Sequence, residues 1–302
     1  MLAAVALCTL AVPTVAHAYC RTTTQPLPAN YSPSRGCFTQ GLYLFWRNAC
    51  VSYSINHAAS RNIPYEDAKR IIDDSFATWM NAVCADGNGP GISVSNIGPA
   101  NCGEVRYNAD STNQNVIVFR DDGWPYDDPY STLGLTTVTF NAETGEIYDA
   151  DMEINSSARN LSITDQVPAK GFDLQSVITH EVGHFLGLAH ATDVRSTMFA
   201  SYKPGSVALR TLAPDDVGGL CAIYPNATTR VVSDQVSPTG TIVAALCDPS
   251  PRHGYSAECS TPKPDDNCSA TPRPTASWAA SGSVALGLAG VLVARRRRAR
   301  TQ

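Results

Sequence analysis

The chain has 302 residues, of which 43% are hydrophobic and 16% are charged, and its formal net charge is −5 at pH 7. This length and apolar content exclude a disordered chain and a mini-protein held together only by disulfides, and they predict one large domain with additional segments. The mildly acidic charge excludes a basic nucleic-acid-binding protein. Ten cysteines are unusual for a cytosolic enzyme, so the composition favours an exported protein with disulfides.

The first eighteen residues form an apolar stretch that ends in the small-x-small pattern of a signal-peptidase site. The stretch is too short to cross a membrane as a helix. We therefore predict a signal peptide at residues 1–18, although no Lys or Arg stands near Met1 as is usual for such segments. An N-terminal core helix is the alternative. Residues 19–44 follow as an N-terminal extension.

Residues 45–225 alternate strand patterns with helix patterns and are predicted to form the main domain. Residues 50–56 alternate like a strand, and Pro64 then opens a helix within residues 65–84. The apolar positions of this helix recur at helical spacing, which predicts a face that packs on a sheet. Those positions are Ala68, Ile71, Ile72, Phe76, Trp79, Met80 and Val83.

Four further strands are expected before the next helix. Short β-rich runs occupy residues 92–95 and 115–120, and an acidic, turn-rich loop follows at residues 121–130. Residues 133–140 and 146–155 then flank the sequence NAETG, which is typical of a hairpin connection. Several strands ahead of a second helix favour an α/β domain with a mixed sheet.

Three carboxylates alternate onto one face of the last of these strands: Asp149, Asp151 and Glu153. We expect this to be a solvated strand face. A calcium site shared with the acidic loop stays open as the alternative, because calcium binds hard oxygen ligands.

The second helix carries the chemistry. Asp173 is a suitable N-cap for a helix that begins at Leu174. His180 and His184 are four residues apart on this helix, so their imidazoles stand on the same side, within reach of one ion. Glu181 lies between them, which completes the HExxH pattern in which two histidines hold Zn²⁺ and the glutamate is the general base.

His190 is the candidate for a third ligand. A helix that continued at about 100° per residue would carry His190 roughly 240° away from His184, so the helix must end first. Gly187 can end it, since glycine accepts a positive φ. Three neutral imidazoles would leave the fourth zinc position open to water, which predicts hydrolysis with Glu181 taking the proton of that water.

The eleven residues from His180 to His190, HEVGHFLGLAH, resemble the H-E-x-x-H-x-x-G-x-x-H pattern of the metzincin zinc proteases. Met198 resembles the methionine of their Met-turn, and residues 198–202 and 212–225 resemble the matrixin branch. The resemblance implies a zincin/metzincin α/β fold, with a twisted mixed sheet of about five strands, two long helices and a C-terminal helix. It also implies a secreted or cell-surface zinc-dependent endopeptidase.

Two departures from the family pattern are visible. Ala191 replaces the serine usual after the third histidine, and residues 121–150 contain no histidine cluster, so we predict one zinc ion and no second one. Asp215 and Asp216 match the aspartate pair at the start of the final matrixin helix, where they would also cap it after Pro214.

The resemblance also implies where an extended peptide substrate would bind. Leu133, Gly134 and Leu135 would lie in the sheet edge to which the substrate adds as a strand. Ser201 and Tyr202 would wall the S1′ pocket beside His180. A catalytically silent adhesion module on the same fold, and a zinc hydrolase with a non-protein substrate, stay open as alternatives. We expect a monomer that does not bind nucleic acid.

The C-terminal part of the chain has a different composition. Residues 226–268 are rich in Ser, Thr, Pro and Asp and predict a linker, which a bridge between Cys247 and Cys259 would pin. Within residues 269–302, an uncharged apolar run at 278–294 precedes four consecutive arginines, which predicts membrane contact through this tail alone.

With Cys268 just upstream, this tail resembles the C-terminal sorting tags of myxobacterial surface proteins, and that resemblance implies export to the cell surface or the medium. Outside the signal peptide and the tag, eight cysteines remain, an even number that favours disulfides over metal clusters. For Cys20 and Cys37 we expect a disulfide rather than a thiol that blocks the zinc.

Overall fold

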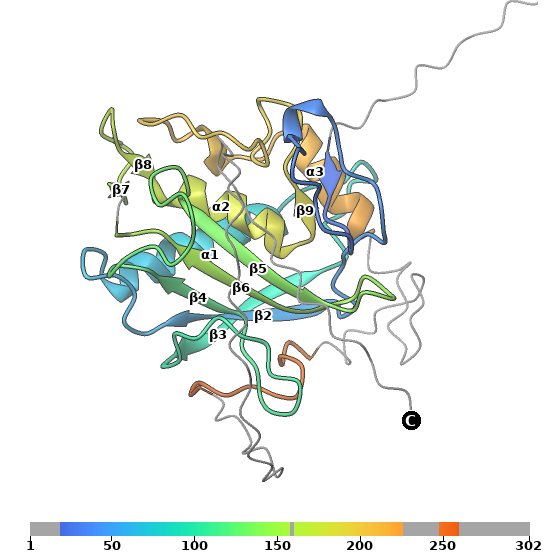
Figure 1. Cartoon of the computed structure of the whole chain (residues 1–302), viewed down its shortest axis with the longest axis horizontal. Coiled ribbons are helices and arrows are strands. Elements are labelled where there is room, and N and C mark those ends of the chain that lie inside the picture. The colour runs from blue at the N-terminus through green and yellow to red at the C-terminus, as the bar shows by residue number, and fades with distance from the viewer. Residues whose placement is uncertain (1–18, 158–159, 226–247, 260–302) are drawn as a thin grey trace, which may run out of the picture.

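The computed structural model describes residues 19–157, 160–225 and 248–259. Its centre is a five-stranded sheet in the order β3-β2-β4-β6-β5 (Figure 1). The strands are β2 (Cys50–Asn56), β3 (Ser93–Ala100), β4 (Val116–Phe119), β5 (Gly134–Phe140) and β6 (Ile147–Ile154). All neighbouring pairs are parallel except β5, which pairs antiparallel with β6 at the edge of the sheet. The expected mixed α/β sheet is confirmed.

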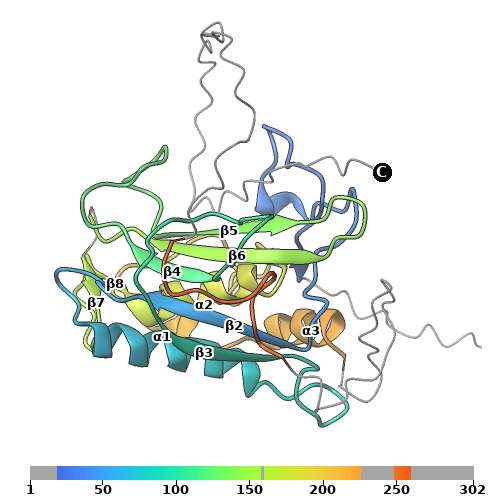
Figure 2. The ribbon, with the colours of Figure 1, turned by 90° about the horizontal axis from the view of Figure 1, so that it is seen from below.

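Two long helices, α1 (Tyr65–Met80) and α2 (Leu174–Phe185), lie on the same face of this sheet (Figures 1 and 2). The C-terminal helix α3 (Pro214–Ile223) follows a 3-10 turn, η2 (Ala208–Arg210). The apolar stripe of α1 packs in the core with one exception. The helix ends at Met80, so helical spacing no longer applies to Val83, which is 66% exposed.

Two further pairs of strands, each strand only two residues long, lie outside the central sheet. β1 (Cys20–Arg21) pairs antiparallel with β9 (Leu188–Ala189), and β7 (Leu161–Ser162) pairs parallel with β8 (Phe172–Asp173). The N-terminal extension also contains a 3-10 turn, η1 (Pro33–Arg35). Strands this short leave no alternating pattern, so the sequence did not predict them.

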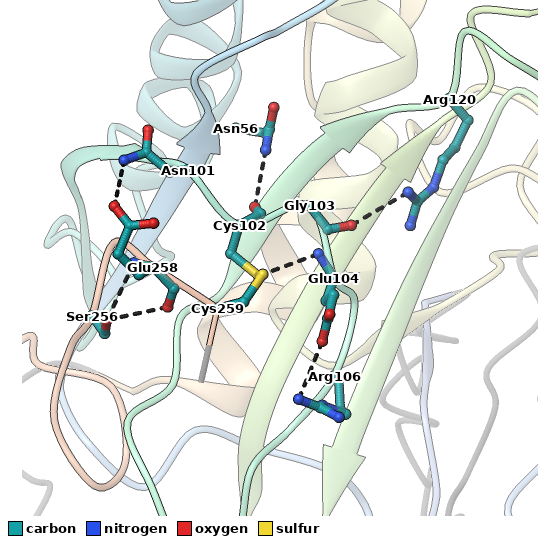
Figure 3. The surroundings of a disulfide bond; sticks show 10 residues. All are labelled: Asn56, Asn101, Cys102, Gly103, Glu104, Arg106, Arg120, Ser256, Glu258 and Cys259. Atoms are coloured by element: carbon teal, nitrogen blue, oxygen red, sulfur yellow. Dashed lines mark hydrogen bonds and ion pairs between the residues drawn. A yellow bond between two sulfur atoms is a disulfide. The ribbon is translucent and has the colours of Figure 1, made fainter. Parts of the chain in front are cut away.

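The expectation that Cys20 and Cys37 are in disulfides is confirmed, and the structure shows that they are bonded to each other. Cys84 pairs with Cys221, which joins the end of α1 to α3. The expectation of a bridge between Cys247 and Cys259 is wrong, because Cys259 is bonded to Cys102 (Figure 3). Cys50 is disulfide-bonded as well.

Residues 248–259, predicted as part of a linker, instead pack along the sheet face opposite α1 and α2 (Figures 1 and 2). The Ser52 hydroxyl on β2 donates to Pro249 O at 2.6 Å. Close to the disulfide, Asn101 donates its backbone N–H to Ala257 O at 2.7 Å and its side-chain amide to Glu258 Oε1 at 2.6 Å (Figure 3). This segment therefore belongs to the folded domain.

The expectation of a solvated face on β6 is wrong. Asp149, Asp151 and Glu153 are 1%, 1% and 0% exposed. Alternation placed all three on one face, but that face is covered, with Val105 packed against Val116 and Val118 of β4 nearby. A strand pattern identifies the residues that share a face and does not show whether another segment covers it.

Within the described part of the chain, no helix has both the length and the apolar character needed to cross a membrane. The predicted signal peptide at residues 1–18 and the apolar run at residues 278–294 with its arginine tail lie outside the described residues.

Candidate active site

Helix α2 begins and ends where its sequence requires. The Asp173 carboxylate caps it by accepting from the Ser176 backbone N–H at 2.9 Å and from the Ser176 hydroxyl at 2.8 Å. The helix ends at Phe185, and Gly187 then adopts φ +92°. A Cβ at Gly187 would lie 2.9 Å from Leu44 O, so both the backbone angle and the space require glycine here.

The turn at Gly187 brings the third histidine back to the first two. The imidazole nitrogens of His180, His184 and His190 all lie within 4.8 Å of one another. Their ring centroids are 4.8 to 5.2 Å apart. Among the described residues, this is the only group of three or more His, Cys, Asp or Glu side chains that could hold a metal ion.

Backbone carbonyls orient two of these rings. His180 Nδ1 donates to Thr197 O at 2.7 Å, and His184 Nδ1 donates to Leu188 O at 2.9 Å. Each ring therefore carries its proton on Nδ1 and presents Nε2 to the centre of the group, the usual arrangement of metal-binding histidines.

Burial lowers the pKa of all three histidines, that of His184 to about 3 and that of His190 well below its ordinary value. The neighbouring histidines lower the pKa of His184 and His190 further. The rings are therefore neutral, which is the form that binds a metal ion. Three converging neutral imidazoles fit one tetrahedral zinc ion with an open fourth position.

A buried methionine packs against α2 at Gly183, between His180 and His184 in the sequence. The Met198 sulfur sits so close to α2 that a Cβ at Gly183 would be 2.1 Å from it. Only glycine fits at this position, the fourth residue of the HEVGH sequence. The HExxH pattern does not specify Gly183, although a glycine inside a buried helix is unfavourable for helix formation and signals a close contact.

Asp216 holds the segment that carries this methionine. Its buried carboxylate accepts from Thr197 N at 2.8 Å, from Met198 N at 3.1 Å and from the Ser196 hydroxyl. It also accepts from Ala213 N at 2.8 Å, which is the expected cap of α3. One carboxylate thus connects the start of α3 with the loop whose Thr197 carbonyl orients His180.

Glu181 faces the edge strand β5. The Thr136 hydroxyl donates to Glu181 Oε2 at 2.7 Å, and a Cβ at Gly134 would lie 2.7 Å from Glu181 Oε1. Burial raises the pKa of Glu181 to about 7, against the opposing effect of the Thr136 hydrogen bonds. Motif reasoning missed Thr136, because its contact with Glu181 depends on how β5 packs on α2.

A small pocket adjoins His180 and Glu181, and its other walls are apolar or aromatic. Of the predicted substrate residues, Leu133 and Tyr202 line it, Gly134 lies against Glu181, and Leu135 is buried on the other face of β5. Ser201 is exposed and is not part of its wall. The lining residues are Leu133, Val177, His180, Glu181, Phe199, Tyr202 and Leu209.

Of the three carboxylates of β6, Asp149 and Asp151 are hydrogen-bonded to each other, whereas Glu153 pairs with other groups. Glu153 contacts Arg120 at 2.6 Å and the Tyr126 hydroxyl, whereas Asp151 accepts from Val116 N at 2.8 Å. Asp149 Oδ1 is buried without a hydrogen-bond partner in the described part of the protein. Burial raises the pKa of Asp149 to about 7 and that of Asp151 well above its ordinary value. The described geometry gives no support to a calcium site.

Comparison with known proteins agrees with this geometry. A family model described as Matrixin matches residues 45–225. Metalloendoproteinase 1 of Glycine max is 34% identical over 103 residues, which cover 34% of this chain and 32% of the relative. Human neutrophil collagenase is 27% identical over 208 residues, covering 68% of this chain and 38% of the relative. The chain therefore spans about a third of the length of these relatives.

Proposed function

The chain belongs to the matrixin family, and from this premise we propose that it is a zinc-dependent endopeptidase. The observation that carries the proposal is the convergence of three neutral histidines beside a buried glutamate, at the edge strand of the sheet. His180, His184 and His190 would hold the zinc ion, and Met198 would support them from below.

When bound, a zinc ion would activate a water molecule and polarise the scissile carbonyl. Glu181 would then act as general base and later as general acid for the leaving amine. Because Thr136 occupies Oε2, Oε1 is the oxygen left to receive the proton of the water.

The substrate would be a peptide in extended conformation. β5 has β6 on one side and is the last strand in the order of the sheet, so its outer edge can pair with an added strand. The pocket beside His180 would take the side chain that follows the scissile bond, called P1′ below. Its apolar wall of Leu133, Val177 and Leu209 favours an apolar side chain.

We also propose that the enzyme works outside the cytoplasm, secreted or at the cell surface. The disulfides Cys20–Cys37, Cys84–Cys221 and Cys102–Cys259 support this, since disulfides persist in oxidising compartments. The signal peptide, the sorting tail, a monomeric state and the lack of nucleic-acid binding stay predictions.

The test is casein cleavage by the chain from Tyr19 onward, which keeps Cys259 and its bond to Cys102. We expect a chelator to abolish cleavage and added zinc to restore it. Glu181→Gln should bind zinc normally and lose activity by roughly 10²- to 10⁴-fold, the usual contribution of a general base. Glu143→Gln, on the exposed turn between β5 and β6, is the matched control and should stay active. Stoichiometric zinc binding without cleavage of casein or of a peptide library would overturn the proposal.

A further inference from the structure

The pocket beside His180 is lined on one side by α2 and the start of β5, and on the other side by a loop. Leu133 precedes β5, and Val177 and His180 belong to α2. Phe199, Tyr202 and Leu209 come from the segment between Met198 and α3, whose regular structure is limited to the single turn η2. The size of the pocket therefore depends on what holds this loop in place.

Arg210, the neighbour of Leu209, ties the loop to the start of α2. Its Nε lies 2.7 Å from Asp173 Oδ2 and its Nη2 lies 2.6 Å from Asp173 Oδ1, a bidentate ion pair. Asp173 is fully buried and is also the N-cap of α2. Because this pairing fixes the guanidinium in orientation as well as in distance, Arg210 holds Leu209 in one position relative to the helix.

Tyr202 makes a second connection to the same residue. Its hydroxyl accepts from the Asp173 backbone N–H at 3.2 Å and donates to Ser206 O at 2.5 Å. Its ring lies against Phe172, with centroids 5.6 Å apart. Two residues of the loop therefore contact Asp173: Tyr202, which lines the pocket, and Arg210, which is next to the lining residue Leu209.

We propose that the Arg210–Asp173 ion pair is a latch that limits the size of the P1′ pocket and restricts P1′ to compact apolar side chains. This inference rests on the proposed endopeptidase function. Arg210 touches neither zinc ligand nor substrate, so it is a positioning residue. With the latch released, Leu209 and Tyr202 move outward with the loop, and the pocket admits larger side chains.

Arg210 also contacts Asp165, and this contact provides a control for the Arg210–Asp173 ion pair. Arg210 Nη1 lies 2.6 Å from Asp165 Oδ1, but the Asp165 side chain is 89% exposed. Exposed ion pairs contribute little, because water screens them and flexible side chains lose entropy in forming them. Asp165→Asn therefore removes one Arg210 contact and leaves the latch to Asp173 intact.

The experiment measures kcat/KM on peptides that differ only at P1′, carrying Ala, Leu, Phe or Trp, with the chain from Tyr19 onward. We expect Arg210→Gln to reduce the preference for Leu over Phe and Trp by about tenfold, while cleavage of the Ala peptide and zinc content change little. Tyr202→Phe, which keeps the ring and loses both hydrogen bonds, should shift the preference in the same direction by a smaller factor. Asp165→Asn should keep the wild-type profile.

An unchanged P1′ profile in an active Arg210→Gln enzyme would overturn the latch. If Arg210→Gln cleaves no peptide at all, Tyr202→Phe decides, and an unchanged profile there rejects the inference. Failure of the wild-type chain to cleave any peptide is a different result, since it would reject the endopeptidase function itself.

Discussion

The two faces of the sheet are built in different ways. The face covered by α2 holds the histidine group, and its residues from Asp173 to Asp216 lie close together in sequence. The opposite face holds Asp149 and Asp151 and is covered by residues 248–259, which a disulfide joins to Cys102 across 157 positions of sequence. The chemistry of this protein is thus encoded locally, whereas the support behind it depends on contacts between distant segments.

The two faces also differ in how their buried charges are satisfied. Asp216 accepts four hydrogen bonds, from Ser196, Thr197, Met198 and Ala213. Asp149 is equally buried, yet its Oδ1 has no partner among the described residues. The Asp149 carboxyl group is hydrogen-bonded only to the equally buried Asp151, and an ionised form of such a group is unfavourable, so we expect substitutions on the two faces to act in opposite directions.

Asp216→Asn is the largest expected loss. Hydrogen bonds to charged groups contribute roughly 1.5 to 3 kcal/mol each, so losing this charge should lower the free energy of unfolding by about 3 kcal/mol or more. Because Thr197 O orients His180, zinc affinity should fall roughly 10- to 100-fold. Denaturant unfolding and zinc competition titration measure both effects. Asp193→Asn, whose carboxylate pairs with the exposed Arg195, is the control, and an equal loss there would contradict this account.

Replacing Cys102 and Cys259 together by serine tests whether the two faces are coupled. Opening a disulfide that closes so long a loop should lower the free energy of unfolding by about 2–4 kcal/mol. Zinc affinity and kcat/KM at 25 °C should stay at the wild-type values, because residues 248–259, which end at this bond, and α2 lie on opposite sides of the sheet (Figure 1). If zinc affinity fell together with stability, the sheet face opposite α2, called the rear face below, would be shown to position the metal ligands.

Asp149→Asn should stabilise the protein, but only at higher pH. Burial raises the folded-state pKa of Asp149 to about 7, while the unfolded chain titrates near 3.8. Folding therefore takes up a proton between these values, and stability falls as the pH rises from about 4 to 7. Asp151, Glu153 and Tyr107 are the titratable groups that interact with this region.

The asparagine variant cannot ionise, so we expect its free energy of unfolding to exceed that of the wild type at pH 8 and to match it below pH 4. Unfolding curves at the two pH values provide the measurement. A stability difference that does not depend on pH would mean that hydrogen bonding, and not the charge, explains the result.

Thr136→Val is the smallest expected effect and concerns catalysis alone. Without the hydroxyl that fixes Glu181 Oε2, kcat should fall about tenfold, equivalent to about 1.4 kcal/mol in the barrier, with KM unchanged. Thr136→Ser keeps the hydroxyl and should restore kcat. Equal losses in the valine and serine variants would assign the effect to packing of the methyl group.

The same contrast explains which features the sequence could predict. The site residues His180, Glu181, His184 and His190 all lie on one helix and the glycine turn that follows it. The known geometry of a helix and of such a turn was therefore enough to predict that they lie close together. Thr136 is 45 positions away from Glu181, and their contact depends on the packing of β5 on α2. No local pattern carries that information.

The contacts on the rear face could not be predicted from the sequence for a similar reason. Eight cysteines allow 105 pairings, so their connectivity cannot be deduced from spacing, and the bond between Cys102 and Cys259 was not predicted. The composition of residues 248–259 is typical of a linker because these residues fold through hydrogen bonds to other segments, such as that from Ser52 to Pro249 O, and not through an apolar pattern of their own.

The disulfide between Cys102 and Cys259 also determines how the domain would carry mechanical load. Tension applied to the chain beyond Cys259 enters the domain at Cys102, just after β3, and bypasses α3 and residues 226–247. A proteolytic cut within residues 226–247 would consequently leave both fragments joined, and they would separate in a gel only under reducing conditions.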